Sequence, residues 1–252
     1  MKYPSPNNLC RIYIPYDSKI GSRDRYGVWS LSDDDACYVA YLADAPTAAK
    51  LDTGRVIDRW FQKQLSEWRK YEDWDQCDRD QGESHLLQWL QKLNQYLIEL
   101  SEAKPTFYAA ITIALRTRSF CHLISIGDTA AYLGQAHGLY RHSGSTELPS
   151  GSTVTNKFLD HLPREAPHLR EADYLGADLN IAERFRLESI EAGGPNLLLL
   201  ISDGIETQIG IPRLCRLLFA YQNSDSLQSQ LLAACSNSEP LDDLAALGIE
   251  TK

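Results

Sequence analysis

The sequence predicts an α/β protein in which antiparallel β-strands form a sandwich accompanied by long helices. Residues 106–116 and 119–127 are apolar runs separated by two residues, which is typical of an antiparallel hairpin, and strand-and-turn patterns continue to residue 141. This succession does not suit alternating βαβ units. Tryptophan and leucine recur at helical spacing in 46–71 and 84–103, where we expect two amphipathic helices.

Other segments extend this pattern at both ends of the chain. The alternating residues 185–190 are predicted to form a hairpin with the strand that begins at Leu197, through the turn at 192–195. The remaining segments with strand or helix patterns predict strands within 9–14, 21–29, 37–45, 128–134, 139–141 and 242–250, and helices at 211–221 and 225–235.

Composition and charge restrict the function. With 252 residues and 43% hydrophobic side chains, the chain can bury a substantial core, and we expect one domain over residues 1–252. The formal net charge of -9 and the pI near 5.2 disfavour a nucleic acid or an anionic membrane as partner, because neither is attracted to an acidic surface. A bound cation or a partner with basic patches fits better.

The ends, cysteines and histidines predict an intracellular, reduced protein. Residues 1–8 lack the apolar core of a signal peptide, and no segment approaches the roughly 18 apolar residues of a membrane span, so we expect a cytoplasmic location. The six cysteines are scattered without a C-x-x-C spacing, which predicts buried free thiols. Five of the six histidines lie between 122 and 168 without metal-pair spacing, and we expect them at the surface.

Two acidic stretches are predicted to be solvated rather than functional. Residues 32–35 form a dense acidic run between two strands, which is most simply an exposed hairpin loop. Residues 72–83 lack the ligand spacing of a calcium-binding loop and are expected to be an exposed acidic connector. The Ser-, Gly- and Pro-rich region 142–180 is expected to be irregular, with a short helix at 156–159.

Three strands place an aspartate at one of their ends. Five aliphatic residues, 197–201, run into Ser202-Asp203-Gly204; the apolar run from Cys37 ends at Asp44; and Asp242-Asp243 opens the last strand. Taken alone, Asp203-Gly204 favours an ordinary turn at the end of a strand. If the three strands are neighbours, however, the carboxylates meet.

Carboxylates that meet need a counter-charge. Two unit charges about 4 Å apart repel by roughly 4 kcal/mol at an effective dielectric near 20, so such a cluster binds a cation or takes up protons. Because carboxylate oxygens are hard ligands, Mg²⁺ or Mn²⁺ is the expected ion.

The order of four short motifs resembles the metal-dependent serine/threonine protein phosphatases, the type 2C or PPM family, as a divergent bacterial-like member. The motifs are Ala43-Asp44, Gly127-Asp128-Thr129, Ser202-Asp203-Gly204 and Asp242-Asp243, and they span most of residues 21–250. No single motif is specific, but their order is. The resemblance implies a four-layer αββα sandwich, in which two antiparallel sheets are flanked by helices.

The resemblance also implies site residues. Asp44 would bridge two Mg²⁺ or Mn²⁺ ions, Asp203 and Asp242 would complete one of them, and the carbonyl of Ala45 would be a further ligand. By position, Arg23 matches the arginine that contacts the substrate phosphate, and Asp24 an acidic residue beside the metals. A surface turn is the alternative for Arg23. The aspartate corresponding to Asp128 is usually structural in the family.

The first motif departs from the family pattern. Where the family has glycines after the aspartate, this chain has Ala45-Pro46, and alanine resists positive φ while proline fixes its own φ and restricts the residue before it. The metal site is therefore expected to be altered in geometry, reduced to one ion, or inactive.

Three functions follow, from different classes. The resemblance implies a phosphatase for signalling, in which a metal-activated water hydrolyses phosphoserine or phosphothreonine of a protein substrate without a covalent intermediate. The first alternative is a pseudophosphatase that keeps the fold as a binding or regulatory module. The second is a metal-free structural protein in which Asp44, Asp203 and Asp242 are turn formers that lie apart.

Overall fold

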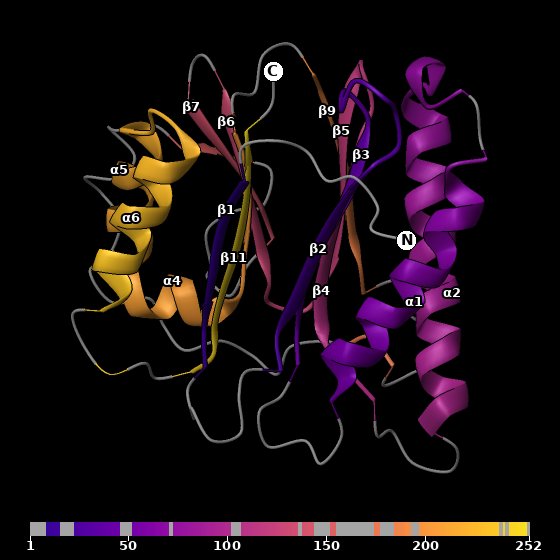
Figure 1. Ribbon diagram of the computed structural model, residues 1–252, viewed down its shortest axis with the longest axis horizontal. Coiled ribbons are helices and arrows are strands. Elements are labelled where there is room, and N and C mark those ends of the chain that lie inside the picture. The colour runs from indigo at the N-terminus through magenta and orange to yellow at the C-terminus, as the bar shows by residue number, and fades with distance from the viewer. Residues whose placement is uncertain are drawn as a thin grey trace.

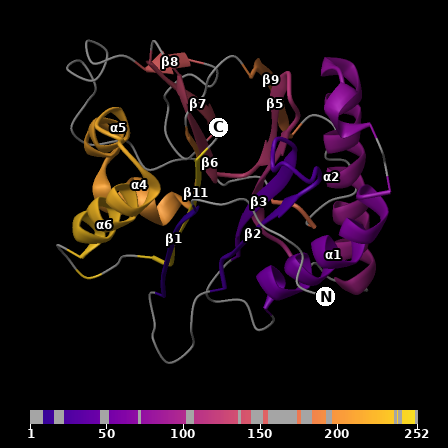
Figure 2. The same ribbon diagram turned by 45° about the horizontal axis from the view of Figure 1, so that its top comes forward.

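Two β-sheets pack face to face between two layers of helices, as Figures 1 and 2 show. The structure is a computed structural model that describes residues 9–15, 23–45, 52–70, 73–101, 107–135, 138–143, 152–154, 174–176, 184–192, 197–236, 239 and 242–250. The predicted αββα sandwich is confirmed.

The first sheet has six strands in the order β1-β11-β10-β6-β7-β8 and the second has five in the order β2-β3-β4-β5-β9. All of the strand pairs recorded are antiparallel. The six-stranded sheet contains β1 (Leu9–Ile14), β6 (Ala130–Gln135), β7 (Gly138–Ser143), β8 (Ser152–Val154), β10 (Leu197–Ile201) and β11 (Leu244–Glu250). The five-stranded sheet contains β2 (Arg25–Ser30), β3 (Tyr38–Asp44), β4 (Ala110–Arg116), β5 (Phe120–Ile126) and β9 (Arg186–Glu191).

Helices cover the outer face of each sheet. The five-stranded sheet packs against α1 (Thr53–Trp68) and α2 (Arg79–Ser101), and the six-stranded sheet packs against α4 (Asp203–Ile209), α5 (Ile211–Phe219) and α6 (Ser224–Cys235). Strand β3 shows why both faces are apolar: Val39 and Tyr41 join the helix-covered core, whereas Ala40 and Leu42 join the core between the sheets. Its continuous apolar run is thus explained by burial on both sides.

One predicted strand pairing is wrong. The hairpin of 106–116 with 119–127 is confirmed as β4 and β5, but β9 does not pair with β10. Instead, β9 pairs with β5, while β10 lies between β11 and β6 in the other sheet. The alternation in 185–190 indicates a half-buried strand, but it does not indicate which sheet that strand joins.

The predicted helices are present, with different ends. Helix α1 begins at Thr53 because the Asp52 side chain accepts from the amide of Arg55, and α2 begins at Arg79 rather than at 84. Helix α4 is not among the predicted elements, because its seven residues are too few to show a helical pattern of apolar side chains. The short helix expected at 156–159 lies outside the described residues.

The segment expected to be an exposed acidic connector is partly buried. A 3-10 helix, η1 (Trp74–Gln76), precedes α2, and both Trp74 and Cys77 lie in the core beside α1 and α2. The indole Nε1 of Trp74 donates to the carbonyl of Trp68 at 2.8 Å. This aromatic anchor holds the link between the two helices against the sheet.

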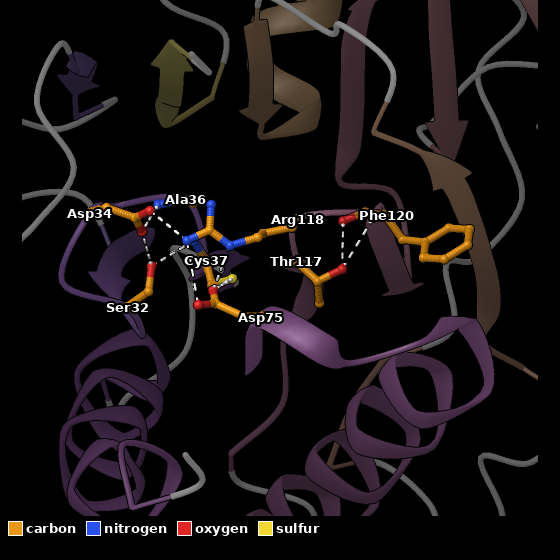
Figure 3. A network of polar contacts seen from close by, with 8 residues as sticks. All are labelled: Ser32, Asp34, Ala36, Cys37, Asp75, Thr117, Arg118 and Phe120. Atoms are coloured by element: carbon orange, nitrogen blue, oxygen red, sulfur yellow. Dashed lines mark hydrogen bonds and ion pairs between the residues drawn. The ribbon is translucent and has the colours of Figure 1, made fainter. Parts of the chain in front are cut away.

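An exposed polar network closes one end of the five-stranded sheet (Figure 3). The Arg118 guanidinium, in the turn between β4 and β5, contacts Asp34 at 2.5 Å and Asp75 at 2.9 Å, and the thiol of Cys37 donates to Asp75 at 3.3 Å. The acidic run 32–35 is therefore a loop with a side-chain ion pair, consistent with its predicted position at the surface.

The cysteine prediction is confirmed and part of the histidine prediction is wrong. All six cysteines are free and buried. His122 and His142, which were expected at the surface, are fully buried because β5 and β7 lie inside the sandwich. No helix in the described part of the chain is both long and apolar enough to cross a membrane.

Candidate functional site

Aspartates from both sheets gather at the end of the sandwich opposite the Arg118 network. Asp24 directly precedes β2, Asp44 ends β3, and Asp128 follows β5. In the other sheet, Asp203 follows β10 and Asp242-Asp243 precedes β11. Antiparallel pairing brings these positions to one edge, because Asp44 pairs with Ala110 at the start of β4 and Ile201 lies opposite Ala130 and Ala246.

On the five-stranded sheet, Asp24 is fully buried and organises the first motif. Its Oδ1 accepts a hydrogen bond from the Ala45 amide at 3.3 Å. The start of α1 presses on the same turn, since a Cβ at Gly54 would lie 2.0 Å from the Arg23 carbonyl oxygen. Ala45 itself is buried against the core under α1, and it is not among the described residues with positive φ. The turn thus accepts alanine where the family has glycine.

On the six-stranded sheet, the Ser202-Asp203-Gly204 sequence has a structural explanation at each position. The Ser202 hydroxyl accepts from the Ala245 amide at 3.0 Å, which ties the end of β10 to the start of β11. Asp203 is the first residue of α4. A Cβ at Gly204 would lie 2.3 Å from the carbonyl oxygen of Asp243, so only glycine allows α4 to begin there.

The acidic pair before β11 divides into an exposed and a buried residue. Asp242 is exposed, and its Oδ1 accepts from the amide of Asp243 at 2.7 Å. Asp243 is buried, and its Oδ2 accepts from the Arg23 amide at 3.2 Å. Asp243 therefore connects the two sheets at the site, and the backbone of Arg23 lies beside the cluster.

The carboxyl groups perturb one another. Desolvation raises the pKa of Asp24 well above its ordinary value, and the negative charge of Asp243 raises it further. Desolvation also raises the pKa of Asp44, with the charges of Asp24 and Asp203 adding to the effect. These shifts are what a cluster of like charges in a desolvated site produces.

The second half of the cluster behaves similarly. Desolvation raises the pKa of Asp203, which shares a hydrogen bond with Asp44. Desolvation, with the charge of Asp203, raises the pKa of Asp128 to about 6. The Asp44 and Asp203 carboxyls therefore lie within hydrogen-bonding reach of each other.

The carboxyls contact one another through Asp44, which shares a hydrogen bond with Asp24 and another with Asp203. Within the described residues, no three His, Cys, Asp or Glu side chains are arranged to hold one metal ion together. The oxygen-only donor set nevertheless suits a hard divalent cation, which would supply the counter-charge that the clustered carboxylates need.

The structure brings the predicted residues Asp24, Asp44, Ala45 and Asp203 into one interacting group, with Asp242 at its exposed rim. The prediction that these aspartates lie apart as independent turn formers is contradicted by the shared hydrogen bond of Asp44 and Asp203.

Sequence reasoning missed three acidic residues near the site. Asp128 was assigned a structural role, yet its pKa responds to Asp203 and Asp242. The resemblance assigns the ligand role to Asp242, although Asp243 is the buried member of the pair. Glu206, on the first turn of α4, carried no signal because it forms part of no motif.

Several solved structures of bacterial serine/threonine phosphatases are similar to this chain over nearly its whole length. The serine/threonine phosphatase Stp1 from Staphylococcus aureus matches with a TM-score of 0.72 at 15% identity, covering 100% of this chain and 98% of that one. The catalytic domain of the serine/threonine protein phosphatase PstP, in complex with two manganese ions, matches with a TM-score of 0.68 at 15% identity over 95% and 96% of the chains. The Mycobacterium tuberculosis phosphatase PstP/Ppp matches with a TM-score of 0.67 at 16% identity over 96% and 98%.

This chain therefore has the fold of the bacterial serine/threonine phosphatases, which confirms the resemblance at the level of the fold. No family model matches the sequence, and no curated protein sequence matches it significantly.

Proposed function

We propose that residues 1–252 form one phosphatase domain that hydrolyses phosphoserine or phosphothreonine in protein substrates with the help of Mg²⁺ or Mn²⁺. The observation that carries the proposal is that Asp24, Asp44 and Asp203 come from two sheets and meet at one edge of the sandwich. The pKa of each of these three carboxyl groups is raised. The fold shared with bacterial serine/threonine phosphatases supports the choice of reaction.

The chain's own residues supply the ligands and hold them. Asp44, Asp203 and Asp242 would hold the Mg²⁺ or Mn²⁺, and Asp24 would support them through its contacts with Asp44 and Ala45. The Ala45 carbonyl is a candidate ligand because the Ala45 amide is already fixed by Asp24. Arg23, whose backbone is bound by Asp243, is the candidate for contacting the substrate phosphate.

A bound divalent cation supplies the acidity that lets water act as a nucleophile near neutral pH. The protein contributes the electrostatic setting: desolvated carboxyls with raised pKa values bind a proton in its absence and exchange that proton for the cation. Metal uptake is therefore expected to release protons and to strengthen as the pH rises.

A second function, a pseudophosphatase that uses the fold as a binding or regulatory module, is favoured by two observations. No three described side chains are arranged to hold a metal ion, and Ala45-Pro46 replaces the glycines of the first motif. In this case the carboxyl cluster remains protonated and metal binding is weak.

The two functions are separated by hydrolysis of an aryl phosphate with and without Mn²⁺, comparing the wild type with Asp203→Asn. If the protein is a phosphatase, the wild type should need Mn²⁺ for activity. Activity of the Asp203→Asn variant should be lower by more than the 10–100-fold that a residue supporting a metal ligand typically contributes. Arg118→Ala, at the opposite end of the sheet, is the control and should retain full activity. If the wild type shows no metal-dependent turnover and calorimetry detects only feeble Mn²⁺ binding, the binding-module function replaces the phosphatase.

A further inference from the structure

A buried ion pair lies directly behind the start of α4. The Arg141 guanidinium on β7 grips the Glu206 carboxylate on α4, with Nη2 at 2.9 Å from each of its oxygens and Nε at 3.1 Å from Oε1. The Tyr132 hydroxyl on β6 donates to the same Oε1 at 2.5 Å. Both charged side chains are 1% exposed, so solvent does not screen the pair.

Glu206 is three residues after Asp203, which places the two side chains on the same side of a helix. Helix α4 is therefore fixed twice within its first turn. Gly204 packs closely against the carbonyl of Asp243, and Glu206 is hydrogen-bonded to Tyr132 on β6 and Arg141 on β7. The charge of Glu206 also contributes to the raised pKa values of Asp203 and Asp128, which indicates that the ion pair and the carboxyl cluster lie close together.

Stability is a poor explanation for this arrangement. Removing two charges from water costs several kcal/mol per ion, and well-packed apolar replacements of a buried pair are often neutral or stabilising. What the pair does provide is direction, because a planar guanidinium with two parallel contacts fixes the carboxylate in one orientation. A short helix of seven residues has few other means of holding its first residue in place.

We propose that Glu206 is a positioning residue: through Arg141 and Tyr132 it sets the place of Asp203 opposite Asp44 at the candidate metal site. The inference rests on the proposed function only in assigning Asp203 to the metal. The fixation of α4 by the buried pair is a separate physical claim with its own measurement.

The test uses the charge-neutral double variant Arg141→Met with Glu206→Leu, because it removes the orienting contacts without leaving an unpaired buried charge. We measure Mn²⁺ affinity by calorimetry, the melting temperature, and amide hydrogen exchange of residues 203–210. Leu90→Ala is the control: Leu90 is fully buried under the opposite sheet, so its loss lowers stability at a place remote from Asp203.

We expect the double variant to melt close to the wild type, to bind Mn²⁺ about 10–100-fold more weakly, and to exchange faster across α4 while α2 keeps its protection. Leu90→Ala should melt lower and retain its Mn²⁺ affinity. Unchanged α4 exchange in the double variant overturns the positioning role, as does unchanged Mn²⁺ affinity.

Failure of the proposed function gives a different result. If the wild type does not bind Mn²⁺, the metal assignment of Asp203 is lost, and the exchange of α4 alone decides whether Glu206 fixes this helix. A second variant, Tyr132→Phe, removes one contact to Glu206 and keeps the ion pair, so its effect on α4 exchange should be smaller than that of the double variant.

Discussion

The two ends of the five-stranded sheet hold their carboxylates in opposite situations. At one end, Asp34 and Asp75 share the Arg118 guanidinium, and the three side chains are 47–51% exposed. At the other end, Asp44 and Asp203 face each other with a shared hydrogen bond. Among the described residues, neither of these two aspartates forms an ion pair with a lysine or arginine.

The difference separates a loop contact from a binding site. Where a counter-charge belongs to the chain and water is near, the acidic residues only fasten loops, and such exposed pairs contribute little to stability. Where carboxyls are desolvated and charged alike, the fold holds them at a cost, and an external proton or cation lowers that cost.

The largest effect is expected from removing a charge at the carboxyl cluster. Asp44→Asn in the metal-free protein at pH 7 should raise the free energy of unfolding by about 1–3 kcal/mol, since like charges about 4 Å apart repel by roughly 4 kcal/mol and proton uptake relieves part of this. Chemical denaturation in the presence of a chelator measures the change.

Mn²⁺ should reverse the order of the two proteins. At about 100 times its dissociation constant, a bound ion adds roughly 2.7 kcal/mol to the stability of the wild type. The variant should gain little, because it lacks the Asp44 carboxylate that is proposed to hold the ion. A variant that is less stable than the wild type without metal contradicts the assignment of repulsion to this cluster.

The next effect concerns His122, a buried side chain whose pKa is lowered by burial, whereas burial raises the pKa values of the carboxyl cluster. Acid therefore lowers the stability that His122 contributes. His122 is fully buried under α2 and contacts Ser189 at 2.7 Å, and burial lowers its pKa to about 4. A Cβ at Gly82 would lie 2.2 Å from the imidazole, so α2 leaves no room for added solvent.

Because this pKa is lower in the folded state, the stability that His122 contributes is present above pH 6.5 and is lost as the pH falls toward 4. Between pH 7 and pH 4.5 the loss is about 2 kcal/mol. His122→Gln keeps a polar side chain beside Ser189 and cannot be protonated, so the difference in unfolding free energy between wild type and variant should shrink or invert from pH 7 to pH 4.5. A pH-independent difference contradicts the prediction.

The smallest effect is expected at the exposed end. Arg118→Ala removes both ion pairs, yet the melting temperature should change little and should lose part of its dependence on salt, because Asp34, Asp75 and Arg118 are all close to half exposed. Thermal unfolding at low and high salt measures this. A fall in melting temperature as large as that of Leu90→Ala would mean that the network is part of the core and not a surface contact.

Local sequence patterns predict the sandwich, the strand ends that carry Asp44, Asp203 and Asp242, and the buried free cysteines. Apolar periodicity reports the burial of a segment, and a motif such as Ser202-Asp203-Gly204 records a local steric need, here the close approach of Gly204 to Asp243. Both signals lie within a few consecutive residues.

The pairing of the strands and the clustering of the acidic residues are visible only in the packed fold. The pairing of β9 with β5 and the ion pair of Arg141 with Glu206 join residues more than 40 positions apart. The burial of Asp243 depends on which face of its turn is covered. Such contacts depend on how two sheets stack and on which charges become desolvated together. Those are properties of the packed molecule, because local patterns are compatible with several partners until the sheets close.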